Sequence, residues 1–171
     1  MQTIYSFPPI AGTNASTLIL GSMPGKISLQ KQQYYAHPQN AFWKIVGEIM
    51  GFAATLTYAQ RSAALANAGI AIWDVLQSCL REGSLDADID HRSIVANDFV
   101  KFYAEHPNIR RVFFNGAKAE AIYLRQVLPL LTNSEIQQRD IIYTRLPSTS
   151  PAHAAMTRAH KLEAWRAIAP L

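Results

Sequence analysis

The sequence predicts an α/β fold of three layers, with a central, mostly parallel sheet of about four strands between helices. Four short apolar runs occur along the 171 residues, and each is followed by a segment with helical spacing or helix-favouring composition. Strands that alternate with helices in this way form parallel sheets covered on both faces. At this length we expect one domain, residues 1–171.

The first half of the chain is expected to hold two strands and two helices. Residues 17–20 form an apolar run that ends at a glycine, which predicts a buried strand leading into a loop. Apolar residues recur at helical spacing over 42–50, and the glycine that follows is placed to end that helix. The alanine-rich stretch 58–68 predicts a second helix with Thr57 as its N-cap, before a strand at 70–73.

The second half alternates in the same way. Its helices are predicted from apolar residues at helical spacing, and its strands from short apolar runs near turn residues. The elements expected there are, in order, a loop at 81–91, a helix with an apolar stripe at Val95, Phe99, Phe102 and Tyr103, a strand at 111–114, a helix with an apolar face at Ala121, Leu124, Leu128 and Leu131, a strand at 140–145 and a helix over about 154–169.

Four segments should meet at one edge of this sheet. In open parallel sheets the ligand cleft lies beyond the carboxyl ends of the strands. The segments that follow the four predicted strands are 21–25, 73–74, 115–116 and 147–153. We therefore expect the functional residues in these segments.

The segment Gly21-Ser22-Met23-Pro24-Gly25 combines two glycines, which allow close approach of the backbone to a ligand, with a proline that stiffens the turn. It lacks the Gly-Lys-Ser/Thr ending of a P-loop and the spacing of a dinucleotide-binding fingerprint. An ordinary turn between a strand and a loop is the alternative interpretation.

The segment 34–40 places aromatic and amide side chains ahead of the predicted helix at 42–50. Tyr35 could stack on a nucleobase, or serve with Tyr34 as a hydrophobic staple for the helix. His37 could act as an acid, or satisfy nearby backbone groups. Asn40 could hold a water molecule or a substrate edge, or cap the helix. In the second predicted strand-end segment, Asp74 could be a carboxylate base or a helix cap.

The loop 147–153 carries three hydroxyl side chains between two prolines and precedes a helix. Hydroxyls and backbone amides at a helix start suit phosphate groups, and Arg158, Lys161 and Arg166 on that helix could extend the site. A capping loop is the alternative.

Composition limits the class of protein. The net charge is +4, and the excess is concentrated in residues 101–171, which carry 10 basic and 5 acidic residues. This bias favours a polyanionic partner, or is simply a solvated basic surface.

Cys79 is the single cysteine, and no Cys/His cluster or HExxH motif occurs, so no metal site and no iron–sulfur cluster are expected. We find no secretion signal, no apolar run of membrane-spanning length and no Gly-x-Ser-x-Gly elbow. We expect a cytoplasmic monomer without a cofactor.

Together these motifs resemble the uracil-DNA glycosylase superfamily over nearly the whole chain. Residues 35–44 resemble the His-Pro-x-Asn-x-Phe-Trp segment of mismatch-specific uracil/thymine glycosylases, and this string is specific. Residues 21–25 and 148–153 resemble the first and second motifs of the superfamily, in the expected order. The remaining segments are most similar to the hypoxanthine (deoxyinosine) DNA glycosylase branch. They are residues 73–76 together with 81–85, and residues 113–116.

The sequence departs from the superfamily pattern at two positions. Met23 stands where the mismatch-specific enzymes carry a catalytic Asn and the classic uracil enzymes an Asp. Ser148 stands where the second motif begins with His or Asn. Both changes count against efficient uracil excision. The resemblance to the hypoxanthine branch implies instead that Asn40 is the catalytic residue.

The resemblance implies a DNA repair enzyme that flips a deaminated base, hypoxanthine first, out of DNA and hydrolyses its N-glycosidic bond. Its partner would be DNA containing deaminated bases. The alternatives are a uracil or xanthine glycosylase of broader range, an inactive DNA-binding module, and a small-molecule hydrolase. The residues expected in the base pocket are Gly21, Ser22, Met23, Pro24, Gly25, Tyr35, His37, Phe42, Trp73 and Asn115. Those expected to bind DNA are Ser148, Thr149, Ser150, Pro151, Ala152, His153 and Arg158.

Overall fold

A four-stranded parallel sheet forms the centre of the molecule in the computed structural model, which describes residues 2–53, 55–132 and 134–170. Its strands are β2 (Thr17–Gly21), β3 (Ile70–Asp74), β6 (Arg111–Asn115) and β7 (Ile142–Leu146), in the order β3-β2-β6-β7. All neighbouring pairs are parallel. Every residue of β2 and β3 is buried, because both faces of the sheet are covered. The predicted three-layer α/β class is confirmed.

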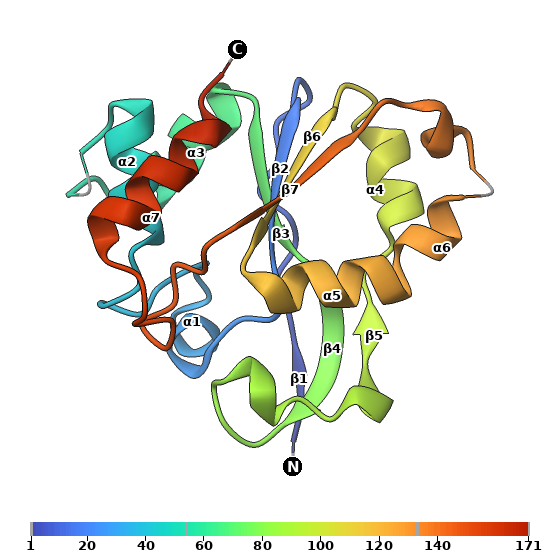
Figure 1. The fold of residues 1–171 in the computed structure, drawn as a ribbon, viewed down its shortest axis with the longest axis horizontal. Helices are drawn as coiled ribbons and strands as arrows, with labels where there is room; N and C mark the ends of the chain where they lie inside the picture. Colours follow the sequence, from blue (N-terminus) through green and yellow to red (C-terminus); the bar gives the residue numbers. More distant parts are fainter. Residues whose placement is uncertain (1, 54, 133, 171) are drawn as a thin grey trace.

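Helices cover both faces of this sheet (Figure 1). One layer contains α2 (Phe42–Met50), α3 (Tyr58–Asn67) and α7 (Arg158–Trp165), and the other contains α4 (Phe99–Glu105), α5 (Ala117–Gln126) and α6 (Leu128–Leu131). The short α1 (Lys26–Lys31) follows the end of β2. In the described part of the chain, 3₁₀ turns lie at η1 (Asp86–Asp88), η2 (His91–Ser93), η3 (Glu135–Gln138) and η4 (Arg166–Ile168).

The predicted limits of the two helices at 42–50 and 58–68 hold closely. Helix α2 ends at Gly51, which adopts the left-handed conformation that glycine tolerates best. Helix α3 begins with a capping box: the Thr57 hydroxyl accepts a hydrogen bond from the Gln60 amide, and the Gln60 side chain accepts one from the Thr57 amide.

A second, antiparallel sheet was not predicted. It joins β1 (Gln2–Tyr5), β4 (Leu76–Arg81) and β5 (Val95–Ala96), in the order β1-β4-β5. Val95 therefore lies in a strand rather than on the predicted helical stripe, and α4 begins after Asp98, whose side chain caps it. Polar residues within β1 and β4, and the two-residue length of β5, concealed these strands, because a strand signal needs an apolar run or a clear alternation.

Two predicted helices differ in detail. The buried face of α5 consists of Ala119, Ile122 and Tyr123, while Leu124 is exposed, and Pro129 lies in the separate helix α6. The last helix begins only at Arg158, so residues 147–157 form a loop. Across the described residues, no helix combines the length and apolar character needed to cross a lipid bilayer.

Candidate functional site

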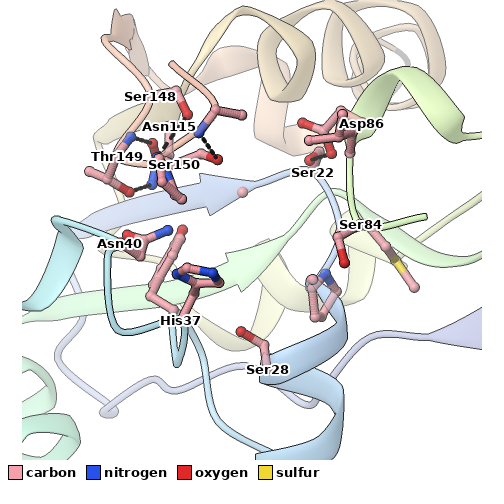
Figure 2. Close-up of a pocket in the computed structure, with 18 of the residues that line it drawn as sticks. Ser22, Ser28, His37, Asn40, Ser84, Asp86, Asn115, Ser148, Thr149 and Ser150 are labelled. Atoms are coloured by element: carbon pink, nitrogen blue, oxygen red, sulfur yellow. Dashed lines mark hydrogen bonds between the residues drawn. The ribbon is translucent and has the colours of Figure 1, made fainter. Parts of the chain in front are cut away.

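A cavity of about 810 Å³ opens at the carboxyl ends of the parallel strands (Figure 2). It is lined from all four predicted strand-end segments: the loop 21–25, Asp74, Asn115 and the loop 148–153. Tyr34, Tyr35, His37 and Asn40 complete one side, and residues 26–28 and 84–87 complete the other. The fold thus brings segments distant in sequence around one space, as the rule for open α/β sheets requires.

The loop after β2 is fixed through its own backbone. The carbonyls of Gly21 and Ser22 accept hydrogen bonds from the amides of Val75 and Leu76, at 2.8 and 3.1 Å. The guanidinium of Arg81, which is buried, donates to the Pro24 carbonyl. These bonds hold the loop rigidly against the start of β4.

At the bottom of the cavity, position 21 has little room for a side chain. Gly21 lies opposite Asp74 in the register of β2 and β3. A Cβ atom on Gly21 would lie 2.5 Å from Asp74 Oδ1 and 3.1 Å from Tyr35 Oη. The first contact is shorter than any real Cβ contact and the second is tight, so a side chain here would have to displace Asp74, and the glycine makes room for both oxygen atoms.

Tyr35 forms an aromatic platform at the cavity. Its ring stacks on the ring of Phe42, with centroids 3.9 Å apart and planes 21° apart. Its backbone has φ of +55°, a strained conformation for a residue with a side chain, and such strain is concentrated at functional sites. Burial first, and then the nearby Asp74 carboxyl, raise the pKa of the Tyr35 phenol, so its hydroxyl stays protonated.

Phe42, expected in the pocket wall, does not line the cavity. It is fully buried behind the Tyr35 ring, in the first turn of α2. It therefore supports the platform from behind, and its predicted direct contact with a base is corrected to an indirect one.

Asn40 combines the two roles that the sequence left open. Its Oδ1 accepts a hydrogen bond of 2.9 Å from the Phe42 amide at the start of α2, although the helix cap itself is Ala41. Its side chain also lines the cavity, beside His37 (Figure 2). The bond to Phe42 fixes the carboxamide orientation, which leaves its NH₂ group available to a ligand. His37 Nδ1 accepts a hydrogen bond from the Gln39 amide, so part of this ring serves the local turn.

Asn115 is turned toward Thr149 rather than toward the centre of the cavity. Its amide nitrogen donates to Thr149 Oγ1 and its oxygen accepts from the Thr149 amide, both at 2.9 Å (Figure 2). The Thr149 carbonyl in turn accepts a hydrogen bond from Ala41, next to Asn40. Asn115 thus positions the loop 147–153 and the start of α2, instead of offering a free carboxamide to a base.

The loop 147–153 forms the rim of the cavity. Thr149 is buried and bonded to Asn115, so its hydroxyl is not free to contact DNA as predicted. Pro151, Ala152 and His153 are exposed. Ser148 and Ser150 accept hydrogen bonds from the amides two residues further on, which keeps the rim compact.

Helix α7 holds both ends of this loop. Lys161 Nζ donates to the His153 carbonyl at 2.8 Å, and Trp165 Nε1 donates to the Pro147 carbonyl at 2.9 Å. Lys161 is buried, so it supports the loop instead of extending a phosphate site. Arg158 lies outside the cavity lining and pairs with Glu48 at 3.7 Å, with both side chains well exposed.

Trp73, also expected in the base pocket, lies away from the cavity. Its Nε1 donates to the Phe7 carbonyl, and its ring packs on Phe99 and Phe102 in the layer of α4. Successive side chains of a strand point to opposite faces, so the residue that reaches the cavity is the next one, Asp74.

Two carboxyl groups at the cavity have unusual environments. Burial, and then the charge of Asp86, raise the pKa of Asp74 to about 8, against the opposing effect of Arg81. Burial also raises the pKa of Asp86, whose Oδ1 accepts a hydrogen bond of 2.5 Å from the Ser22 hydroxyl. Perturbed carboxyls in a cleft are typical of functional sites. The sequence leaves the role of Asp74 open and predicts only a loop over 81–91, the segment that holds Asp86.

Comparison with known proteins places these features in context. The family model described as the uracil DNA glycosylase superfamily matches residues 8–169. A protein of Methanosarcina barkeri named hypoxanthine DNA glycosylase is 41% identical over 114 residues, which are 66% of this chain and 71% of the relative. A protein of the same name from Methanosarcina acetivorans is 34% identical over 163 residues, 95% of each chain. The solution NMR structure of a proposed uracil DNA glycosylase from Methanosarcina acetivorans superimposes with a TM-score of 0.78 at 33% identity, over 98% of this chain and 96% of that one.

Proposed function

Because this chain belongs to the uracil DNA glycosylase superfamily, we propose that it is a monofunctional DNA glycosylase that removes deaminated bases, hypoxanthine first, from DNA. The two relatives named hypoxanthine DNA glycosylase support the choice of base. One observation carries the proposal: the Asn40 carboxamide and the Tyr35 ring line the same cavity, beside the loop 21–25.

The cavity suits a base that has left the DNA stack. Its volume lies in the range of sites that enclose small ligands. Extruding a base costs a few kcal/mol, and less where the base is already mispaired by deamination. The Tyr35 ring, backed by Phe42, would recover part of this energy by stacking on the base. The exposed residues 151–153 would meet the duplex at the rim.

In the reaction, a water oxygen forms a bond to the sugar C1′ as the bond from C1′ to the base nitrogen breaks. The bonding electron pair leaves with the base, and the proton that the water loses passes to solvent, from which the base anion takes up a proton to become neutral. The backbone amides of Ser22 and Met23, in the loop at the cavity, would stabilise the developing negative charge on the base. Asn40 would orient the water, a task in which position matters more than basicity because the sugar already carries positive character.

The test measures release of hypoxanthine and uracil from duplex oligonucleotides. We expect Asn40→Ala to lower the single-turnover rate on hypoxanthine DNA by about 10²–10³, by analogy with loss of an oxyanion-hole donor. Asn67→Ala is the matched control, because Asn67 is an exposed residue at the end of α3. Full activity of Asn40→Ala would remove Asn40 from its role, and an inactive wild type would overturn the enzyme assignment.

Met23 supports a second candidate function. It is buried and lines the cavity, so an apolar thioether occupies the position at which the sequence analysis noted a missing acid or amide. A DNA-binding module without catalysis would show salt-sensitive binding to DNA and no base release. A panel of hypoxanthine, xanthine, uracil and thymine lesions distinguishes this candidate from a glycosylase of broader range.

A further inference from the structure

We propose that the carboxyl of Asp74, which lies beside the hydroxyl of Tyr35, recognises the edge of the extruded base at which a ring N–H stands beside a carbonyl. This inference rests on the proposed glycosylase function and assigns the group that reads the base. Hypoxanthine, xanthine and uracil all present such an edge.

The two oxygen-bearing side chains converge at the bottom of the cavity. A Cβ atom on Gly21 would contact both Asp74 Oδ1 and Tyr35 Oη, so they flank the space that this glycine leaves open. Asp74 lines the cavity although its side chain is almost wholly buried. Its backbone is also fixed, because Asn97 Nδ2 donates to its carbonyl at 2.8 Å.

Each side chain carries one buried polar atom without a hydrogen-bond partner. Among the described residues, these atoms are Asp74 Oδ2 and Tyr35 Oη. A buried polar group left unpaired costs about 1–3 kcal/mol, so such groups are rare in folded proteins. Because Asp74 lines the cavity, its unpaired oxygen indicates that a ligand completes the hydrogen bonding of this carboxyl.

The chemistry of a protonated carboxyl matches the proposed base edge. A carboxylic acid offers one O–H donor and one carbonyl acceptor, side by side. The acid O–H donates to the base carbonyl while its second oxygen accepts from the ring N–H.

The surroundings of Asp74 favour its neutral form. The charged and titratable groups near it are Asp86 from η1, Arg81 from β4, and Tyr34 and Tyr35 from the segment before α2. Burial and Asp86 outweigh Arg81, and the pKa of about 8 leaves Asp74 mostly protonated at neutral pH. The Ser22 hydroxyl is bonded to Asp86 and so is not placed to donate to Asp74. Above this pKa the carboxylate has no donor and repels the base carbonyl.

The test measures kcat/KM for release of hypoxanthine from duplex DNA between pH 6 and 9.5. It compares wild type with the variants Asp74→Asn and Asp74→Leu. For wild type we expect a fall of about tenfold per pH unit above 8, because only the acid form is competent. Asp74→Asn keeps a hydrogen-bond donor and an acceptor but cannot ionise. This variant should therefore remain active, and its kcat/KM should not decrease above pH 8. Asp74→Leu offers neither a donor nor an acceptor, so it should lose about 10²-fold below pH 8 and show no fall of its own above it, which narrows its deficit as wild type falls. Asp140→Asn, at an exposed residue outside the cavity lining, is the matched control and keeps the wild-type profile.

The outcomes separate this inference from the proposed function. A wild-type fall that persists in Asp74→Asn, or Asp74→Leu activity within threefold of wild type below pH 8, overturns the role of Asp74 while the glycosylase assignment stands. If wild type releases no base, the same variants are compared by equilibrium binding to hypoxanthine-containing and undamaged duplexes. Equal discrimination by wild type and Asp74→Leu would then overturn the inference. Thermal melting identifies a variant that fails to fold, in which case the Asp74→Asn profile decides.

Discussion

Asn115 and Thr149 are joined by a reciprocal pair of hydrogen bonds, each 2.9 Å long, which ties the end of β6 to the loop after β7. The Thr149 carbonyl continues this connection to Ala41 at the start of α2. The rim of the cavity and the residue proposed for catalysis therefore depend on one carboxamide.

We expect Asn115→Ala to lower the free energy of unfolding by about 1–3 kcal/mol, because it leaves the buried groups of Thr149 unpaired. Base release should fall as well, since the start of α2 loses a support. Asn115→Asp can still accept from the Thr149 amide and hydroxyl, so it should be milder on both measures. Urea unfolding and single-turnover kinetics check this. Equal effects of the two substitutions would contradict the pairing argument.

Gly21→Ala should cost about 1–3 kcal/mol of stability and most of the base-release activity, because its Cβ would displace Asp74 and Tyr35. The matched control is Gly25→Ala in the same loop. A Cβ there meets nothing within 4 Å, and the backbone φ is −73°. We expect that control to remain within about 0.5 kcal/mol of wild type. Thermal melting with kinetics distinguishes the two, and a tolerated Gly21→Ala would show that the cavity floor is adaptable.

Asp74→Asn should stabilise the protein in a pH-dependent manner. The folded pKa of about 8 lies above the ordinary value of 3.8, so folding disfavours the charged form. The cost to stability is absent below pH 3.8, grows as pH rises toward 8, and is complete above it. Melting temperatures of wild type and variant should agree near pH 4 and differ by roughly 10–20 °C at pH 8.5. A difference in melting temperature that does not change with pH would show that the pKa of Asp74 is not raised in the folded protein.

The Tyr35 ring and hydroxyl can be separated by two substitutions. Tyr35→Ala removes the stacking platform and should weaken base release by about 10- to 100-fold, the value of one base–aromatic stack. Tyr35→Phe keeps the stack on Phe42 and removes a buried hydroxyl without a partner, so stability should hold or rise while base release falls only a few-fold. A Tyr35→Phe variant as impaired as Tyr35→Ala would assign the main role to the hydroxyl.

Local patterns in the sequence determined the four parallel strands, the helices α2 and α3 with their ends, and the segments that would meet at the cavity. Gly21 lines the cavity as expected, because the topology brings strand ends together. Tyr35, His37 and Asn40 also line it, although they lie between α1 and α2, where only the resemblance to the family had placed them. The strand β4, which contains polar residues, the two-residue strand β5 and the true face of α5 were not predicted, since their pairing and packing depend on partners distant in sequence.

The tertiary structure decided which side chains actually reach the cavity. The alternation along β3 points Trp73 into the α4 layer and Asp74 into the cavity, a choice that no local pattern reveals. Only the packing of η1 and β4 against the loop 21–25 brings Asp86 and Arg81 close enough to set the protonation of Asp74. Hydrogen bonding and burial depend on neighbours in three dimensions, and the order of residues along the chain does not contain those neighbours explicitly.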